Sequence, residues 1–275
     1  MEPVCGTCGV QFAAGEAPPA HCPICEDERQ YVGLDGQTWT TLDALREDRR
    51  NVLVTEEPGL TSIRTDPQFA IGQRALLVET PQGNVLWDCI SLVDDATVAA
   101  LRERGGVAAM AISHPHFYST MVEWSRALGG VPIFVHEHDR RWVMRPDPAV
   151  RPWSGSSPSL PGGLTLVHVG GHFEGSQVLL WPAGAGGKGV LFVGDMPNVC
   201  SDRRWVTFMR SYPNYIPLSA AEAERVVSAL RPLSFDRIYG WSLERVIPTE
   251  ARRSLERSLT RHLRALRGEH GVVAW

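Results

Sequence analysis

Residues 107–120 read VAAMAISHPHFYST, an apolar segment that runs directly into two histidines separated by one proline. The apolar part predicts a short buried β-strand. His114 and His116 lie two positions apart, so on an extended segment their side chains project to the same face. Pro115 favours an extended backbone at His114. The pair suits two imidazoles on one metal ion, although an HxH pair alone is a weak indicator.

Polar residues also follow other apolar segments, at the points where strands are expected to end. LTLVHV at 164–169 is followed by Gly170-Gly171-His172, GVLFV at 189–193 by Gly194-Asp195, and NVLWD at 84–88 ends in Asp88. A glycine before the polar residue lets the backbone turn sharply toward a buried centre. A shared ion would explain why several apolar strands each end in histidine or aspartate.

The remaining pattern predicts an α/β layered domain with two sheets covered by helices. Strands are expected at 75–80, 84–88, 107–112, 132–136, 164–169, 177–182, 189–193 and 235–239, and helices at 40–50, 91–104, 119–129, 219–231 and 249–266. PQGN at 81–84 indicates a hairpin turn between the first two strands. The Pro/Gly/Ser-rich stretch 145–163 is expected to be a long loop at the edge of a site.

Four of the six cysteines fall within the first 25 residues, as Cys5-x-x-Cys8 and Cys22-x-x-Cys25. This spacing is typical of a tetrahedral zinc site. Residues 1–30 are therefore predicted to form a structural zinc ribbon that draws its folding energy from the metal, followed by a helical linker at 31–50. A redox-active or unmetallated tail is the alternative. His21, next to Cys22, is a competing ligand.

Composition narrows the functional classes. With 275 residues, 43% hydrophobic content, 21% charged content and a net charge of −4, the chain has no general attraction for nucleic acid or an anionic membrane surface. The segment MEPVCGTCGV lacks the basic and apolar regions of a secretory signal, so we expect a cytoplasmic protein. The expected partner is a small-molecule substrate, and a homo-oligomer is left open.

The order of these motifs resembles the metallo-β-lactamase superfamily, over about residues 50–275. An aspartate after the second strand, then HxH, GGH and GD, match the family order at Asp88, His114, His116, His172 and Asp195. The resemblance implies an αββα sandwich spanning 51–275, in which the three histidines hold one metal and the GD aspartate bridges to a second. It also implies that Asp88 positions the ligands, and that a metal-bound hydroxide attacks a carbonyl, lactone, thioester or phosphoester.

The chain departs from the family pattern at three positions. Tyr118 and Ser119 replace the Asp and His that complete HxHxDH, and Trp241 stands where the last His is expected. These three positions normally complete the second metal site, so we predict a single zinc or iron ion. Asp195 is then a fourth ligand or is hydrogen-bonded to a coordinated water, and it is the candidate base. Tyr118 is a candidate donor to an oxyanion, or a ring that fills the vacated site.

The sequence gives weaker indications of a functional role for three further groups of residues. His136 and His138 in VHEHD also form an HxH pair, but they are expected to be surface positions, and His168 a core or ligand-supporting residue. The segment 200–217 is rich in arginine and aromatic residues. The family often lines its substrate pocket with this region, so Arg203, Arg204 and Trp205 are candidate substrate contacts. Packing of that loop is the alternative.

The function that these observations favour is a metal-dependent hydrolase of a small ester, thioester, lactone or similar substrate, with one metal and an activated water. A mononuclear non-haem iron oxidoreductase is a second hypothesis, because histidine and carboxylate ligands also suit Fe(II). A non-catalytic metal-binding scaffold, with the zinc ribbon as its interaction element, is the third.

Overall fold

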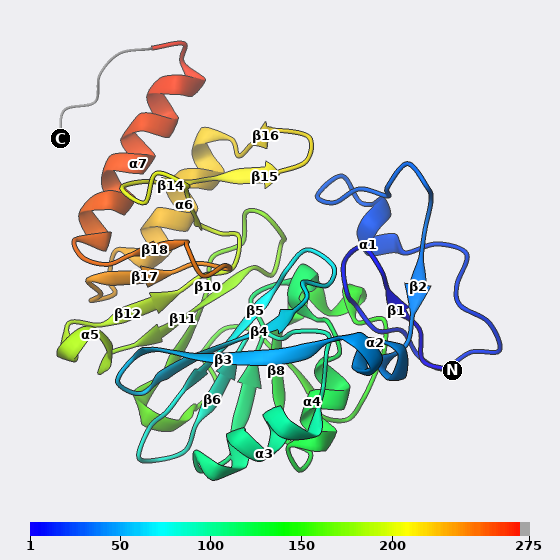
Figure 1. Cartoon of the computed structure of the whole chain (residues 1–275). Helices are drawn as coiled ribbons and strands as arrows, with labels where there is room; N and C mark the ends of the chain where they lie inside the picture. Colours follow the sequence, from blue (N-terminus) through cyan, green and yellow to red (C-terminus); the bar gives the residue numbers. More distant parts are fainter. Residues whose placement is uncertain (270–275) are drawn as a thin grey trace.

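Two β-sheets face each other in the computed structural model, which describes residues 1–269 (Figure 1). The first sheet has seven strands in chain order: β3 (Arg50–Glu57), β4 (Leu60–Asp66), β5 (Arg74–Val78), β6 (Val85–Trp87), β7 (Ala109–Ala111), β8 (Ile133–His136) and β9 (Val150–Trp153). Neighbours from β3 to β6 are antiparallel, and those from β6 to β9 are parallel.

The second sheet has five strands in the order β10-β11-β12-β17-β18. They are β10 (Thr165–His168), β11 (Gln177–Trp181), β12 (Val190–Phe192), β17 (Arg237–Tyr239) and β18 (Val246–Ile247). The pair β12–β17 is parallel and the other pairs are antiparallel. Short strand pairs and turns complete the chain: β13 (Asn198–Val199), β14 (Val206–Thr207), β15 (Met209–Ser211), β16 (Ile216–Pro217), α5 (Gly184–Gly187), η1 (Pro115–Phe117), η2 (Glu137–Trp142) and η3 (Pro161–Gly163).

Helices cover the outer face of each sheet, as Figure 1 shows. They are α3 (Asp95–Glu103) and α4 (Met121–Ala127) on the first sheet, and α6 (Ala220–Leu230) and α7 (Ala251–Leu266) on the second. A separate cluster, which includes Trp87, Leu179 and Phe192, fills the space between the sheets. The structure therefore has the four-layered αββα arrangement that the sequence predicts.

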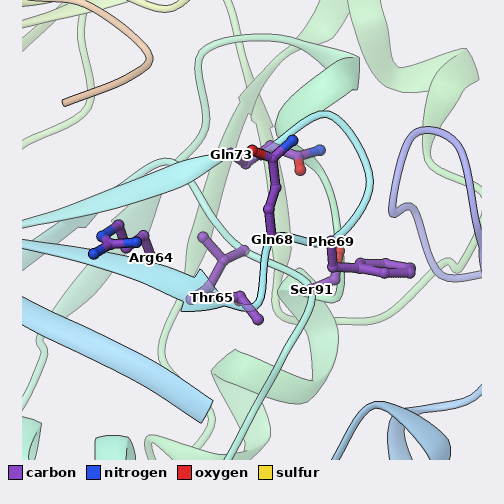
Figure 2. Close-up of a pocket in the computed structure, with 8 residues that line it drawn as sticks. Arg64, Thr65, Gln68, Phe69, Gln73 and Ser91 are labelled. Carbon is purple, nitrogen blue, oxygen red and sulfur yellow. The ribbon is translucent and has the colours of Figure 1, made fainter. Parts of the chain in front are cut away.

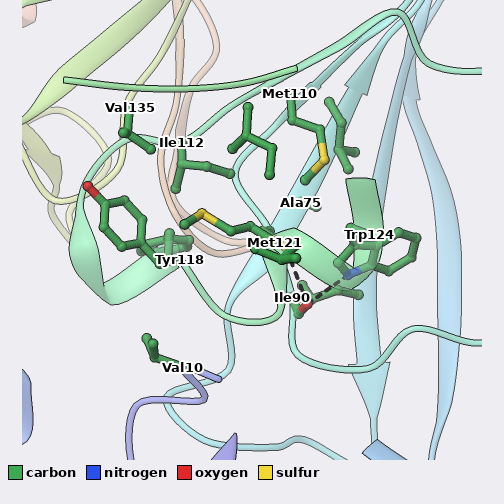
Figure 3. Close-up of a cluster of buried hydrophobic side chains, with 14 of the residues drawn as sticks. Val10, Ala75, Ile90, Met110, Ile112, Tyr118, Met121, Trp124 and Val135 are labelled. Atoms are coloured by element: carbon green, nitrogen blue, oxygen red, sulfur yellow. Dashed lines mark hydrogen bonds between the residues drawn. The ribbon is translucent and has the colours of Figure 1, made fainter. Parts of the chain in front are cut away.

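The N-terminal segment packs on the first sheet. Strand β1 (Val4–Cys5) pairs with β2 (Trp39–Thr40), the short helix α1 (Pro23–Glu26) carries the second cysteine pair, and α2 (Leu42–Asp48) leads into β3. All four cysteines of this segment belong to the same buried cluster as α4. Figure 3 shows Val10 of this segment near Tyr118 and Met121. The segment thus buries its apolar side chains against the main sheet, and the boundary at residue 30 stays a prediction.

Every predicted strand and helix overlaps an observed one, but several elements were missed. The strands β3 and β4 lie before residue 70, and β9 lies inside the stretch expected to be a loop. Strand β9 contains Pro152, which a sheet tolerates here because β9 is its edge strand. Among residues 1–269, no helix is long and apolar enough to cross a membrane.

Candidate metal centres

Four potential ligands from both sheets converge on one point. His114 and His116 follow β7 of the first sheet, while His172 follows β10 and Asp195 follows β12 of the second. Gly194 allows this approach, since a Cβ atom there would lie 2.4 Å from Oγ of Ser113. The four side chains that the sequence predicts as ligands are therefore brought together.

The spacing of the four donor atoms fits one ion. Asp195 Oδ2 lies 3.3 Å from Nε2 of His114, 4.0 Å from Nδ1 of His116 and 3.8 Å from Nε2 of His172. The last two nitrogens are 3.4 Å apart. A tetrahedral ion with bonds of about 2.0–2.1 Å separates its ligand atoms by about 3.4 Å. The arrangement is thus close to four-coordinate geometry.

Hydrogen bonds on the far side of two rings hold them in place. Nδ1 of His114 is 2.9 Å from Oγ of Ser113, and Nδ1 of His172 is 2.8 Å from the backbone oxygen of Arg210. A proton on Nδ1 of His172 leaves the Nε2 lone pair directed at the centre, as in metal-bound histidines. The buried Nε2 of His114 has no hydrogen-bond partner in the structure. A metal ion would satisfy it.

Burial sets the charge state of the site. The three histidines are 2%, 2% and 0% exposed in chain order. Burial lowers the pKa of His116 and places that of His172 well below its usual value, so both rings are neutral ligands. Burial alone would raise the pKa of Asp195, but the neighbouring side chains of His114 and His116 outweigh this effect and the pKa is lowered. The Asp195 carboxylate is therefore an anion beside the neutral rings of His116 and His172.

Asp88 contacts the segment that carries the HxH pair. Its Oδ1 accepts a hydrogen bond of 2.6 Å from the backbone nitrogen of Ser113, next to His114. The residue is buried with a positive φ of 59°, a strained conformation for aspartate. Burial raises the pKa of Asp88 to about 8. This contact is the one that a ligand-positioning residue would make.

The four cysteines of the N-terminal segment form a second cluster. Sγ of Cys5 is 3.6 Å from Sγ of Cys25, and Sγ of Cys8 is 3.8 Å from Sγ of Cys22. Tetrahedral zinc with Zn–S bonds of about 2.3 Å separates its sulfurs by about 3.8 Å, so the cluster fits that ion. His21 is not a competing ligand, because its side chain is 73% exposed and pairs with Glu26 at 2.7 Å.

The chain is similar to known proteins in both sequence and structure. No family model matches the chain. The uncharacterized protein YmaE of Bacillus subtilis (strain 168) is 48% identical over 268 residues, which cover 97% of either chain. The chain belongs to the YmaE family.

Solved structures identify the fold of this YmaE family member. FIM-1 metallo-β-lactamase of Pseudomonas aeruginosa, solved in a mono-zinc form, matches with a TM-score of 0.56 at 16% identity, over 80% of this chain and 97% of that one. DIM-1 metallo-β-lactamase matches with a TM-score of 0.57 at 12% identity, over 78% and 98%. VMB-1 matches with a TM-score of 0.57 at 13% identity, over 79% of this chain and 98% of that one. The chain has the metallo-β-lactamase fold.

In this YmaE family member, two of the three positions that depart from the family pattern are buried, and the third packs against the core. Tyr118, labelled in Figure 3, is 1% exposed. Its hydroxyl donates to the backbone oxygen of Asp139 at 3.4 Å. Oγ of Ser119 donates to the backbone oxygen of Cys89, and Trp241 packs against the same buried cluster. This packing supports the core-filling interpretation of Tyr118, while its catalytic role stays a prediction.

Of the predicted substrate contacts, Trp205 packs against α7. Arg204 forms a two-point ion pair with Asp202, with N–O distances of 2.8 and 2.7 Å. The Trp205 ring lies under the guanidinium groups of Arg257 and Arg261, and Arg203 is exposed. The substrate role of these residues stays a prediction.

Two residues without a sequence signal connect the cysteine cluster with the histidine site. Nε2 of Gln73 donates to the backbone oxygens of Cys8 at 2.7 Å and His116 at 2.9 Å. Figure 2 shows Gln73 and Ser91 among the residues that line a cavity of about 70 Å³. Arg29 donates to the backbone oxygen of His172 at 3.2 Å and lies 4.0 Å above the ring of Phe173.

A third cluster corrects the prediction that His136 and His138 are both surface residues. His136 is only 3% exposed and stacks on His168, with His138 at the edge of both rings. Burial lowers the pKa of His136 to about 4. Sequence alone showed only two of these three histidines as a pair, because His168 comes from the other sheet.

Proposed function

We propose that this chain is a metal-dependent hydrolase of a small ester, thioester, lactone or similar substrate, using one metal ion held by His114, His116, His172 and Asp195. The observation that carries the proposal is the shape of the cluster. Four donors surround one centre, and the side chain of the single carboxylate is its most exposed member, at 13%. A reactant would reach the ion on the Asp195 side.

Some residues of the site would bind the ion, and others would fix the orientation of its ligands. The histidines would hold it through Nε2, Nδ1 and Nε2 in chain order, with Ser113 and Arg210 fixing two of the rings. A divalent ion bound there supplies Lewis-acid chemistry and lowers the pKa of a coordinated water to about 7.

Asp195 is the candidate proton acceptor. Its carboxylate is ionised, and its backbone oxygen accepts a 2.8 Å hydrogen bond from the hydroxyl of Tyr212, which fixes the turn that carries it. With a divalent ion held by these ligands, the Asp195 carboxylate would be placed to accept a proton from a water in the site.

One observation favours a non-catalytic metal-binding scaffold instead. All three histidines are almost fully buried, and four protein ligands already complete a tetrahedron, as in structural zinc sites. The iron oxidoreductase has less support, because three histidines with one carboxylate differ from the two-histidine triad of non-haem iron enzymes.

Cobalt substitution separates the hydrolase from the scaffold. We would load the full-length chain carrying His138→Ala, which removes one ligand of the separate His136, His138 and His168 cluster, with Co²⁺ and record the visible spectrum as azide is added. An exchangeable position would shift the bands, and a closed four-ligand site would leave them unchanged. An unchanged spectrum would therefore favour the scaffold.

Turnover of ester, thioester and lactone panels then tests the hydrolase. Asp195→Asn should lower kcat by about 10²- to 10⁴-fold if Asp195 is the base. His116→Ala should abolish metal-dependent activity, while Asp35→Asn, a change at an exposed carboxylate of the N-terminal segment, should leave it unchanged. Metal-dependent turnover of none of the panels would contradict the proposal.

A further inference from the structure

We propose that His136, His138 and His168 form a third metal site, which binds a late first-row divalent ion such as zinc, nickel or copper. Its ligand set shares no residue with the cysteine cluster or with the site at Asp195. The three donor nitrogens all lie within 4.8 Å of one another. Neutral imidazoles suit these metals, whereas magnesium and calcium prefer oxygen ligands.

The histidines come from two sheets that meet at this edge of the fold. His136 ends β8 of the first sheet, His138 lies in the following turn η2, and His168 ends β10 of the second. The rings of His136 and His168 have centroids 3.8 Å apart with an interplanar angle of 9°. The centroid of His138 is 4.7 Å from that of His136 and 5.3 Å from that of His168.

A hydrogen bond fixes which nitrogen of His168 is available. Its Nε2 lies 2.8 Å from the backbone oxygen of Glu174, so it carries the proton and donates. Nδ1 therefore keeps its lone pair. A second ring nitrogen bonded to a backbone oxygen is a common feature of metal-binding histidines.

Binding requires a small rearrangement that this site permits. Two ligands with metal–nitrogen bonds of about 2.0–2.1 Å can be no more than about 4.1 Å apart, so the nitrogens must draw together. The parallel rings must also tilt for their lone pairs to meet. His138 is exposed and can rotate, and His168 is only partly buried. Of the three histidines, only His136 is buried.

The site opens on a large cavity, which leaves room for the remaining ligand. His138 and His168 line a cavity of about 460 Å³, together with Glu174, Arg210 and Arg225. Three protein nitrogens leave at least one coordination position for water or a small anion from this cavity. Hence the ion would be exchangeable, unlike one enclosed by four cysteines.

Zinc stoichiometry tests the proposal. The full-length protein and its variants would be dialysed against micromolar Zn²⁺ and analysed by mass spectrometry for metal per chain. Wild type should hold three zinc ions. His138→Ala and His168→Gln should hold two, and Arg140→Ala, an exposed change in the same turn, should still hold three.

Further measurements separate loss of the site from loss of the fold. His138→Ala changes an exposed side chain, and its melting temperature in chelator should equal that of wild type. The double variant His116→Ala/His138→Ala should hold one ion, in the cysteine cluster. The proposal is overturned if wild type holds only two ions, or if His138→Ala and His168→Gln retain three.

Discussion

Gln73 is a single residue that contacts both of the predicted metal clusters. Its side-chain amide donates to the backbone oxygens of both Cys8 and His116. Gln73→Leu would leave these two buried oxygens without that donor, and we expect the free energy of unfolding to fall by about 1–3 kcal/mol. Urea denaturation measures this loss.

Gln68→Ala is the matched control, because Gln68 is exposed in the same loop. We expect it to change the free energy of unfolding by less than about 0.5 kcal/mol. Equal stability of the Gln73→Leu variant and wild type would show that the bridge does not contribute.

Tyr118→Phe tests whether that residue has any catalytic role. The change removes a hydroxyl whose hydrogen bond to Asp139 is 3.4 Å long, so the expected loss of stability is less than about 1 kcal/mol. Metal content and turnover should match wild type. A tenfold fall in kcat with unchanged metal content would instead support the oxyanion-donor hypothesis.

Sequence predicted the ligands because their signals are local. HPH, GGH and GD each combine a strand end with a ligand inside a few residues, and all four ligands meet in the structure. Gln73 and Arg29 could not be predicted in this way. Their partners lie 43 to 143 positions away in the chain, and a glutamine or arginine carries no pattern that indicates such a contact.

At the scale of elements, the cysteine segment is held directly against the loops that carry the ligands. The backbone oxygen of Glu28 accepts hydrogen bonds from Ser211 and Asn214, and Arg29 contacts the oxygen of His172. Cys22→Ser should therefore lower zinc binding in the cysteine cluster and also speed metal loss from the histidine site. Metal analysis after timed dialysis against a weak chelator measures both.

Cys200→Ser is the control for this experiment, since Cys200 lies outside the cysteine cluster. It should release metal at the wild-type rate. If Cys22→Ser loses only the ribbon ion and retains the other as long as wild type does, the two sites are independent.

Elements with continuous apolar runs were predictable, and those without them were not. Strands such as β11 and β12 are buried throughout, so their sequences are apolar along their length. Strand β3 has no fully buried residue, and proline interrupts β9. Both form because a neighbouring strand supplies the hydrogen bonds, which composition does not show.

For the whole molecule, metal removal should cost stability. An ion that binds only the folded chain contributes about 2.7 kcal/mol at a concentration 100 times its Kd. Chelation should therefore lower the melting temperature, and added Zn²⁺ should restore it. In the His116→Ala variant, added Zn²⁺ should raise the melting temperature by less, because only the remaining metal sites can bind the ion. Equal recovery in both proteins would contradict a stabilising ion at His116.

The origin of the ligands on two different sheets also bears on how fast the protein unfolds. His114 and His116 belong to one layer of the sandwich, and His172 and Asp195 to the other. A bound ion thus acts as a cross-link between layers that are otherwise joined by apolar packing and by hydrogen bonds such as those from Gln177 and Arg74. Separation of the layers must break metal–ligand bonds, so the ion is expected to slow unfolding and lengthen the lifetime of the native state.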